Sequence, residues 1–240
     1  MIDFAVIVIT LASLTASFVN AAFATGGVYI MLLASVWVLP VSAAIPLQSA
    51  FAAASLAARI HFFWEHIRWS IAIVFVLGCF IGVYFGARTF VALPESTLSI
   101  LLGLVLLTLL WMPKWKRGFP IRHPFFFVGV LHSYLGALLG VGGVLQPSIL
   151  RTSLTKLEIT GTLAVCLLVL DGLKVTAYVS FGFSYFDYVP HIVGATIAGF
   201  VGTWLGKRVT HVISEETFRT VFKIFVTLVA LRLIYIGWAN

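Results

Sequence analysis

The sequence predicts an all-α polytopic membrane protein built from two related halves. Of its 240 residues, 61% are hydrophobic and only 10% are charged, and the mean hydropathy is +1.11. The segment Phe4–Ala58 runs 55 positions without one Asp, Glu, Lys, Arg or His. Because a membrane span needs about 20 apolar residues, this segment alone implies at least two crossings. A soluble domain of this length cannot bury so much apolar surface.

Ten apolar stretches follow one another along the chain, and each is expected to form a helix. The first repeat, residues 1–112, contains Phe4–Ala24, Val28–Leu39, Ala43–Ala58, Trp69–Ala87 and Ser96–Met112. The second repeat, residues 125–240, contains Phe125–Leu139, Val144–Leu150, Leu157–Tyr178, Tyr188–Gly206 and Thr217–Trp238. The first stretch is expected to be a retained helix and not a signal peptide, because it is preceded by Asp3 and by no Lys or Arg.

A basic linker, residues 113–124, separates the halves, with Lys114, Lys116, Arg117 and Arg122 and no acid. Short basic loops face the cytoplasm in membrane proteins, so we predict that this linker is cytoplasmic and that the protein lies in a cell inner membrane. Counting helices from the linker places three further loops inside and two outside. The inner loops are Arg59–Arg68, Arg151–Glu158 and Lys207–Arg219, and the outer ones are Ser180–Asp187 and Arg88–Glu95, where Arg88 departs from the rule.

The net charge of +7 is therefore assigned to loops that face anionic lipid. We expect a lipid bilayer as partner and no nucleic acid. The two cysteines, Cys79 and Cys166, both lie in apolar stretches and have no CxxC spacing, which favours a packing role. No metal and no cofactor is expected.

Three segments of the first half recur in the same order in the second half, offset by 116 to 120 positions. Thr25-Gly-Gly-Val28 matches Val141-Gly-Gly-Val144, Gly82–Arg88 matches Gly202–Arg208, and Leu93–Thr97 matches Ile213–Thr217. This indicates an internal duplication. Since corresponding loops are predicted on opposite sides of the membrane, the halves are expected to be inverted repeats, as in many secondary transporters. Each repeat then needs a partly re-entrant helical hairpin.

Val28–Leu39 and Val144–Leu150 are too short to span a bilayer. Each follows a Gly-Gly pair and has a proline after or within it, Pro40 and Pro147. Broken helices in a bilayer are tolerated where protein or water surrounds them, and matched breaks in two repeats point to a substrate site near the midplane. A helix that opens after Gly-Gly offers amide groups suited to an anion. The alternative is tight helix packing at the glycines.

The second break, Gly140-Val-Gly-Gly-Val-Leu-Gln-Pro147, followed by Glu158-Ile-Thr-Gly-Thr-Leu163, resembles the signature of the TauE/SafE family of membrane transporters. The first half is similar but weaker: Ala24-Thr-Gly-Gly27 lacks one glycine, and Ile45-Pro-Leu-Gln-Ser49 stands where a Gly-Thr-Ser turn is expected. The resemblance covers nearly the whole chain. It implies transport of sulfite, of organosulfonates such as sulfoacetate, or of related sulfur-containing anions.

The candidate substrate-binding residues are the glycines of the two breaks and polar groups near them: Asn20, Thr25, Gly26, Gly27, Tyr29, Gln48, His132, Gly142, Gly143, Gln146, Thr162 and Lys174. For Asn20 and His132 the alternative is a helix–helix hydrogen bond, and His132 could also carry a proton with the anion. Lys174 either forms a structural i,i+3 pair with Asp171 or lends positive charge to an anion path. Arg59 stands near the corresponding place in the first half, but could simply mark a helix end in the cytoplasmic interface.

We therefore predict a secondary transporter of small anions that works by alternating access at a site between the repeats. An integral-membrane enzyme acting on a lipid or thiol is the alternative, although the sequence has no HExxH or CxxC motif and no cluster of paired carboxylates. A third possibility is a non-transporting assembly subunit. Glycine stripes at Gly78, Gly82 and Gly86 and at Gly194, Gly202 and Gly206 favour close helix packing, with a homodimer seam as a further option.

Overall fold

The computed structural model describes residues 3–23, 26–111, 124–209 and 215–239, and within these ranges it contains helices and no strand. The first half forms α1 (Phe4–Phe23), α2 (Gly27–Val38), α3 (Val41–Phe63), α4 (Trp69–Ala92) and α5 (Glu95–Trp111). The second half forms α6 (Pro124–Leu139), α7 (Leu145–Ile149), α8 (Lys156–Ser180), α9 (Val189–Val209) and α10 (Glu215–Ala239). Short 3₁₀ turns, η1 (Trp64–His66) and η2 (Phe186–Tyr188), precede α4 and α9.

The predicted fold class, an all-α membrane protein, is confirmed. Among the described residues, five segments are long and apolar enough to cross a membrane: α1, α3, α4, α8 and the segment formed by η2 and α9. Two helices run further than the apolar stretches predicted. α3 continues through Arg59 to Phe63, and α4 continues through Arg88 to Ala92. The exposed Arg88 side chain can extend its charge toward water from within the helix. Residues 113–123 of the predicted linker lie outside the described residues.

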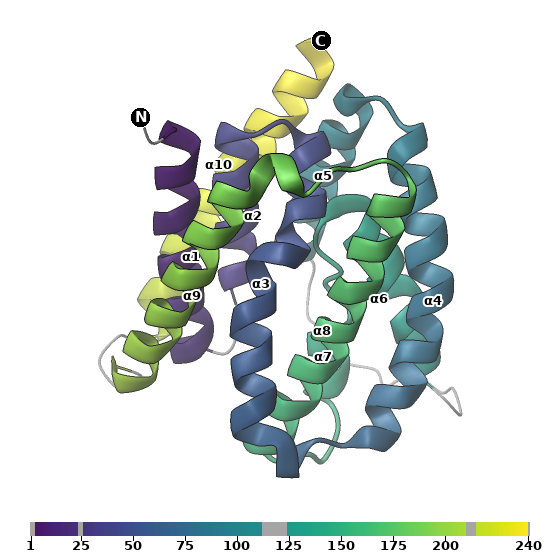
Figure 1. Ribbon diagram of the computed structural model, residues 1–240, viewed down its shortest axis with the longest axis vertical. Helices are drawn as coiled ribbons and strands as arrows, with labels where there is room; N and C mark the ends of the chain where they lie inside the picture. Colours follow the sequence, from purple (N-terminus) through teal and green to yellow (C-terminus); the bar gives the residue numbers. More distant parts are fainter. Residues whose placement is uncertain (1–2, 24–25, 112–123, 210–214, 240) are drawn as a thin grey trace.

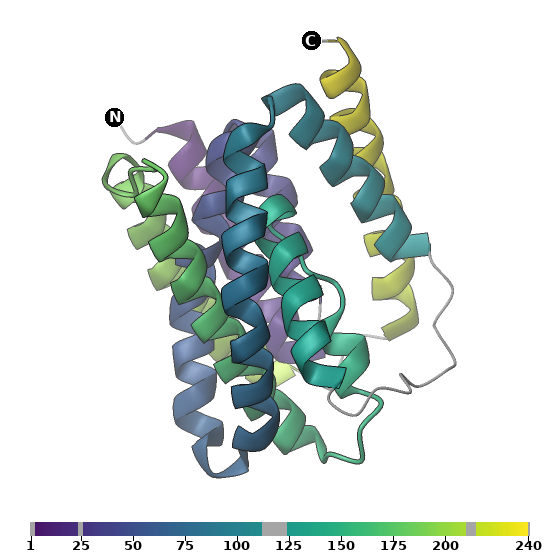
Figure 2. The ribbon, with the colours of Figure 1, turned by 90° about the vertical axis from the view of Figure 1, so that its right-hand side faces the viewer.

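The helices of the two halves are interleaved in the bundle. α1 packs along α9, α4 packs along α6, and α3 and α8 lie against each other in the middle (Figure 1). α5 and α10 form a further pair, which Figure 2 shows at one side of the bundle. Each of these four pairs joins one helix from each half. The bundle is therefore held together by contacts between the halves.

Two pairs of corresponding helices run in opposite directions in the bundle. In Figure 1, α3 descends from the upper to the lower end of the bundle, and α8 rises from the lower to the upper end. α4 likewise rises where α9 descends. The α3–α4 connection and the start of α8, two regions predicted to be cytoplasmic, both lie at the lower end. The α4–α5 and α8–α9 connections, predicted to be external, lie at the upper end.

Glycines on α4 allow the backbone of α6 to approach closely. A Cβ built on Gly82 would collide with the carbonyl oxygen of Val130 and the hydroxyl of Ser133. A Cβ on Gly86 would lie 2.6 Å from the carbonyl oxygen of Tyr134, closer than real Cβ atoms come. Small residues at such crossings let helices gain van der Waals contact where lipid supplies no hydrophobic driving force.

The same contact recurs between α9 and α1. Gly202 faces the carbonyl oxygen of Leu14, and Gly206 faces that of Phe18. The carbonyls on α1 lie 116 positions before the two carbonyls on α6 that the α4 glycines contact. The glycines on α9 lie 120 positions after those on α4, so both offsets match the internal duplication. The glycine stripes are therefore equivalent packing surfaces in the two halves.

Replacing Gly82 by alanine is expected to destabilise the bundle by about 1–3 kcal/mol, because an added methyl group must push the α6 backbone away. The matched control is Gly172→Ala on α8, where a Cβ meets nothing within 4 Å. The check is the thermal unfolding temperature of both purified variants in detergent. Equal unfolding temperatures for the two variants would contradict the close-packing role of Gly82.

Candidate functional site

A cavity of about 120 Å³ lies inside the bundle, and both glycine breaks line it. Gly27 at the start of α2 contributes one part of the wall, and Gly142 and Gly143 between α6 and α7 contribute another. The rest of the lining comes from this second break and from α1, α2, α3, α6, α7 and α8. The volume is enough for several water molecules or one small polyatomic ion. The structure thus brings together the two segments that the sequence singled out separately.

At the first break, the chain turns back between α1 and α2 and is held by side-chain hydrogen bonds. Gly26 has a φ of 100°, a conformation that favours glycine. The backbone N–H of Gly27 donates to Asn20 Oδ1 at 3.0 Å. From α3, Gln48 Nε2 donates to the carbonyl oxygen of Val28 at 3.0 Å. The hairpin is therefore fixed by one side chain from the helix before it and one from the helix after it.

At the second break, Gly140 and Gly143 adopt left-handed backbone conformations, with φ of 77° and 67°. The chain reverses here, and His132 on α6 fixes it: its Nδ1 accepts the backbone N–H of Val144 at 3.3 Å and that of Leu145 at 3.1 Å. A ring nitrogen that accepts hydrogen bonds carries no proton, so these contacts assign the proton of the neutral ring to Nε2. His132 is buried, with 4% of its surface exposed.

These hydrogen bonds change the expected role of the half-helix ends. The sequence suggested that first-turn amides of both short helices face the substrate, but Asn20 and His132 occupy the amides of Gly27, Val144 and Leu145. The physical reason is that a buried N–H without a partner costs about 1–3 kcal/mol, and lipid offers no replacement. Asn20 and His132 line the cavity, but in each side chain one acceptor atom is already hydrogen-bonded to the backbone.

Charged side chains from α3 and α8 complete the cavity wall. Lys174 has only 3% of its surface exposed, and its Nζ lies 3.3 Å from Asp171 Oδ1. Arg59 on α3 also lines the cavity, and its Nε is buried with no hydrogen-bond partner among the described residues. Asp171 and Arg59 were not among the predicted site residues. Their signal was a charge inside or beside an apolar stretch, which is costly in a membrane and so marks function.

Most of the predicted site residues that the structure describes gather at this cavity. Its lining includes Asn20, Gly27, Tyr29, Gln48, His132, Gly142, Gly143, Gln146 and Lys174. Gly26 and Thr162 lie outside the lining, and Thr25 lies outside the described residues. Sequence reasoning missed three serines of the lining, Ser13, Ser17 and Ser55, because a single serine in an apolar helix gives no pattern that distinguishes a cavity from helix packing.

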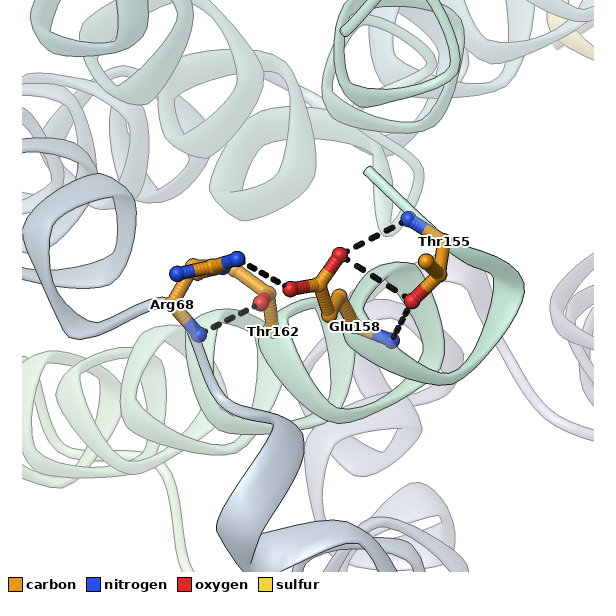
Figure 3. A network of polar contacts seen from close by, with 4 residues as sticks. All are labelled: Arg68, Thr155, Glu158 and Thr162. Atoms are coloured by element: carbon orange, nitrogen blue, oxygen red, sulfur yellow. Dashed lines mark hydrogen bonds and ion pairs between the residues drawn. The ribbon is translucent and has the colours of Figure 1, made fainter. Parts of the chain in front are cut away.

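Thr162 takes part in a different structure, a polar network at the lower end of the bundle (Figure 3). Its hydroxyl accepts the backbone N–H of Arg68 at 3.0 Å. The Arg68 side chain forms an ion pair with Glu158, which also accepts the backbone N–H of Thr155 at 2.8 Å. Thr155 and Glu158 together form a capping box at the start of α8. The network joins the segment before α4 to the first turns of α8.

Replacing His132 by alanine should lower stability by about 1–3 kcal/mol, because two buried amides at the start of α7 lose their acceptor. His132→Asn places an amide oxygen near the position of Nδ1 and should recover part of the loss. Thermal unfolding of wild type and both variants in one detergent is the measurement. Identical unfolding temperatures for the alanine and asparagine variants would contradict the capping role.

Taken together, the membrane-length helices and the cavity lined by charged and polar groups define an integral membrane protein with an internal cavity. The family model described as sulfite exporter TauE/SafE matches residues 9–233, and the chain belongs to this family. The resemblance noted in the sequence is thereby confirmed. The protein is a membrane transporter of the kind that handles sulfite and related sulfur anions, and the membrane-enzyme alternative is set aside. Neither the curated proteins nor the solved structures gave a significant match.

Proposed function

We propose that the protein is a secondary transporter that carries sulfite or a small organosulfonate across the cell inner membrane, with the cavity as its substrate site. The observation that supports this most is that both glycine breaks and the buried Lys174 line the same cavity. An anion there meets positive charge and polar side chains inside an otherwise apolar bundle, where electrostatic attraction is weakly screened.

Alternating access is the mechanism that this arrangement favours. The cavity wall has one part from each half, and α3 and α8, one from each repeat, lie against each other beside it. If one half rocks against the other, the wall opens first to one side of the membrane and then to the other. His132 suggests a proton link: a proton on Nδ1 would break both of its backbone hydrogen bonds and release the start of α7.

Uptake into proteoliposomes tests the proposed function directly. The purified protein is assayed with sulfite, sulfoacetate, taurine and carboxylate analogues, with and without a pH gradient. We expect saturable uptake of at least one sulfur-containing anion. If the pH gradient leaves the uptake rate unchanged, only the proposed proton coupling is contradicted. If a protein shown to be folded takes up none of the compounds, the proposed transport of these substrates is contradicted.

A substitution at the second break tests the site. Gly143→Leu forces a branched side chain into a left-handed conformation, at a cost of about 1–3 kcal/mol, and its Cβ would lie 2.6 Å from both methyl carbons of Leu109. We expect transport to be lost while membrane insertion is retained. Gly172→Leu, a change into open space on α8, serves as the control. Unchanged transport by Gly143→Leu would favour a packing role for this glycine.

A further inference from the structure

The charges that line the cavity do not balance. Among the described residues, the ionisable Arg, Lys, Asp and Glu side chains of the lining are Arg59, Asp171 and Lys174. Lys174 and Asp171 form an ion pair at 3.3 Å and largely neutralise each other. Arg59 has no ion pair or hydrogen bond with a described residue, and its Nε is sealed from solvent. The cavity therefore holds one uncompensated positive charge, and that charge is on Arg59.

Arg59 is partly buried, and a partly buried guanidinium that has no counter-ion is still costly inside a membrane protein. Arginine stays charged at any physiological pH, so it cannot escape this cost by losing its proton. Its N–H groups are all donors, held in a planar fork that matches two oxygens of one oxyanion. The partner that Arg59 lacks must therefore supply negative charge and paired oxygen acceptors. Sulfite and sulfonate groups have both.

We infer that Arg59 is the counter-charge of the transported anion and that it sets the substrate class, an inference that rests on the proposed function. One net positive charge accepts a sulfur oxyanion that carries no amine. It disfavours a zwitterionic aminosulfonate such as taurine, because the ammonium group would add a second uncompensated positive charge to that of Arg59. Asp171 does not compensate the ammonium charge, since its carboxylate is already paired with Lys174. Arg59 thus favours sulfite and sulfoacetate over taurine.

The test compares wild type with Arg59→Gln, Arg59→Lys and the control Arg88→Gln, whose side chain is exposed on α4 and outside the cavity. The first measurement is sulfite uptake in proteoliposomes. Arg59→Gln is expected to raise the sulfite KM by about tenfold or more, and Arg59→Lys, which keeps the charge without the fork, should fall between it and wild type. Arg88→Gln should match wild type. Competition by unlabelled taurine should be weak in wild type.

The second measurement is thermal unfolding in detergent with sodium sulfite or sodium chloride at equal ionic strength. Wild type should be stabilised by sulfite and Arg59→Gln should not. Without sulfite, Arg59→Gln should unfold at or above the wild-type temperature, because a partly buried charge that has no partner has been removed. A clearly lower unfolding temperature for Arg59→Gln would indicate that Arg59 has a structural partner in the protein, and it would overturn the inference.

The outcomes separate this inference from the proposed function. If wild type transports sulfite and Arg59→Gln does so with the same KM, the inference is wrong and the proposed function stands. If taurine competes as well as sulfite, the assigned specificity is wrong. A third outcome is that wild type transports no compound of the panel, while sulfite stabilises wild type and does not stabilise Arg59→Gln. In that case Arg59 binds the anion, and the inference stands although the proposed transport does not. No sulfite stabilisation of folded wild type would overturn the inference.

Discussion

Backbone polar groups in the middle of a membrane protein need partners from the protein itself, and the two helix breaks create such groups at the cavity. Asn20 and His132 supply them, each from the long helix that precedes its break. With an offset of 116, His132 corresponds to Ala16 and Asn20 corresponds to Gly136. Each half therefore has one capping side chain and one small residue a helical turn apart. The small residue comes first in the first half, and the capping residue comes first in the second half. The halves reach the same backbone arrangement with different chemistry, which leaves a titratable group at one break only.

The fold was largely predictable from the sequence, because the apolar stretches are long and the breaks between them carry glycine, proline or charge. Helix ends were less certain, since Arg59 and Arg88 lie within helices and not at their edges. Pairing across the halves was not predictable. The stripe of Gly82 and Gly86 indicates a close crossing but does not name the helix opposite, which is set by three-dimensional packing.

The candidate site was predictable as a region and less so in its roles. Glycine pairs at matching places led to the cavity, but spacing alone did not show that His132 would occupy the amides of α7. Thr162 was proposed as a polar group near the second break, but its hydroxyl accepts the backbone N–H of Arg68 at the end of the bundle. Arg59 was undervalued because it follows an apolar run directly, where a basic residue normally marks the interface.

The balance of charge in the cavity also bears on release of the substrate. A transporter must bind its anion strongly enough to remove it from water and weakly enough to let it go. Two unpaired cations in a medium that screens poorly would hold a sulfur oxyanion too tightly to turn over. In the proposed site Asp171 removes this difficulty by neutralising Lys174, so that one fixed positive charge would face the anion. On this proposal the Lys174–Asp171 pair is more than a structural ion pair. Both residues lie one helical turn apart on α8 in the cavity lining, so the pair would tune affinity for the anion at the site itself.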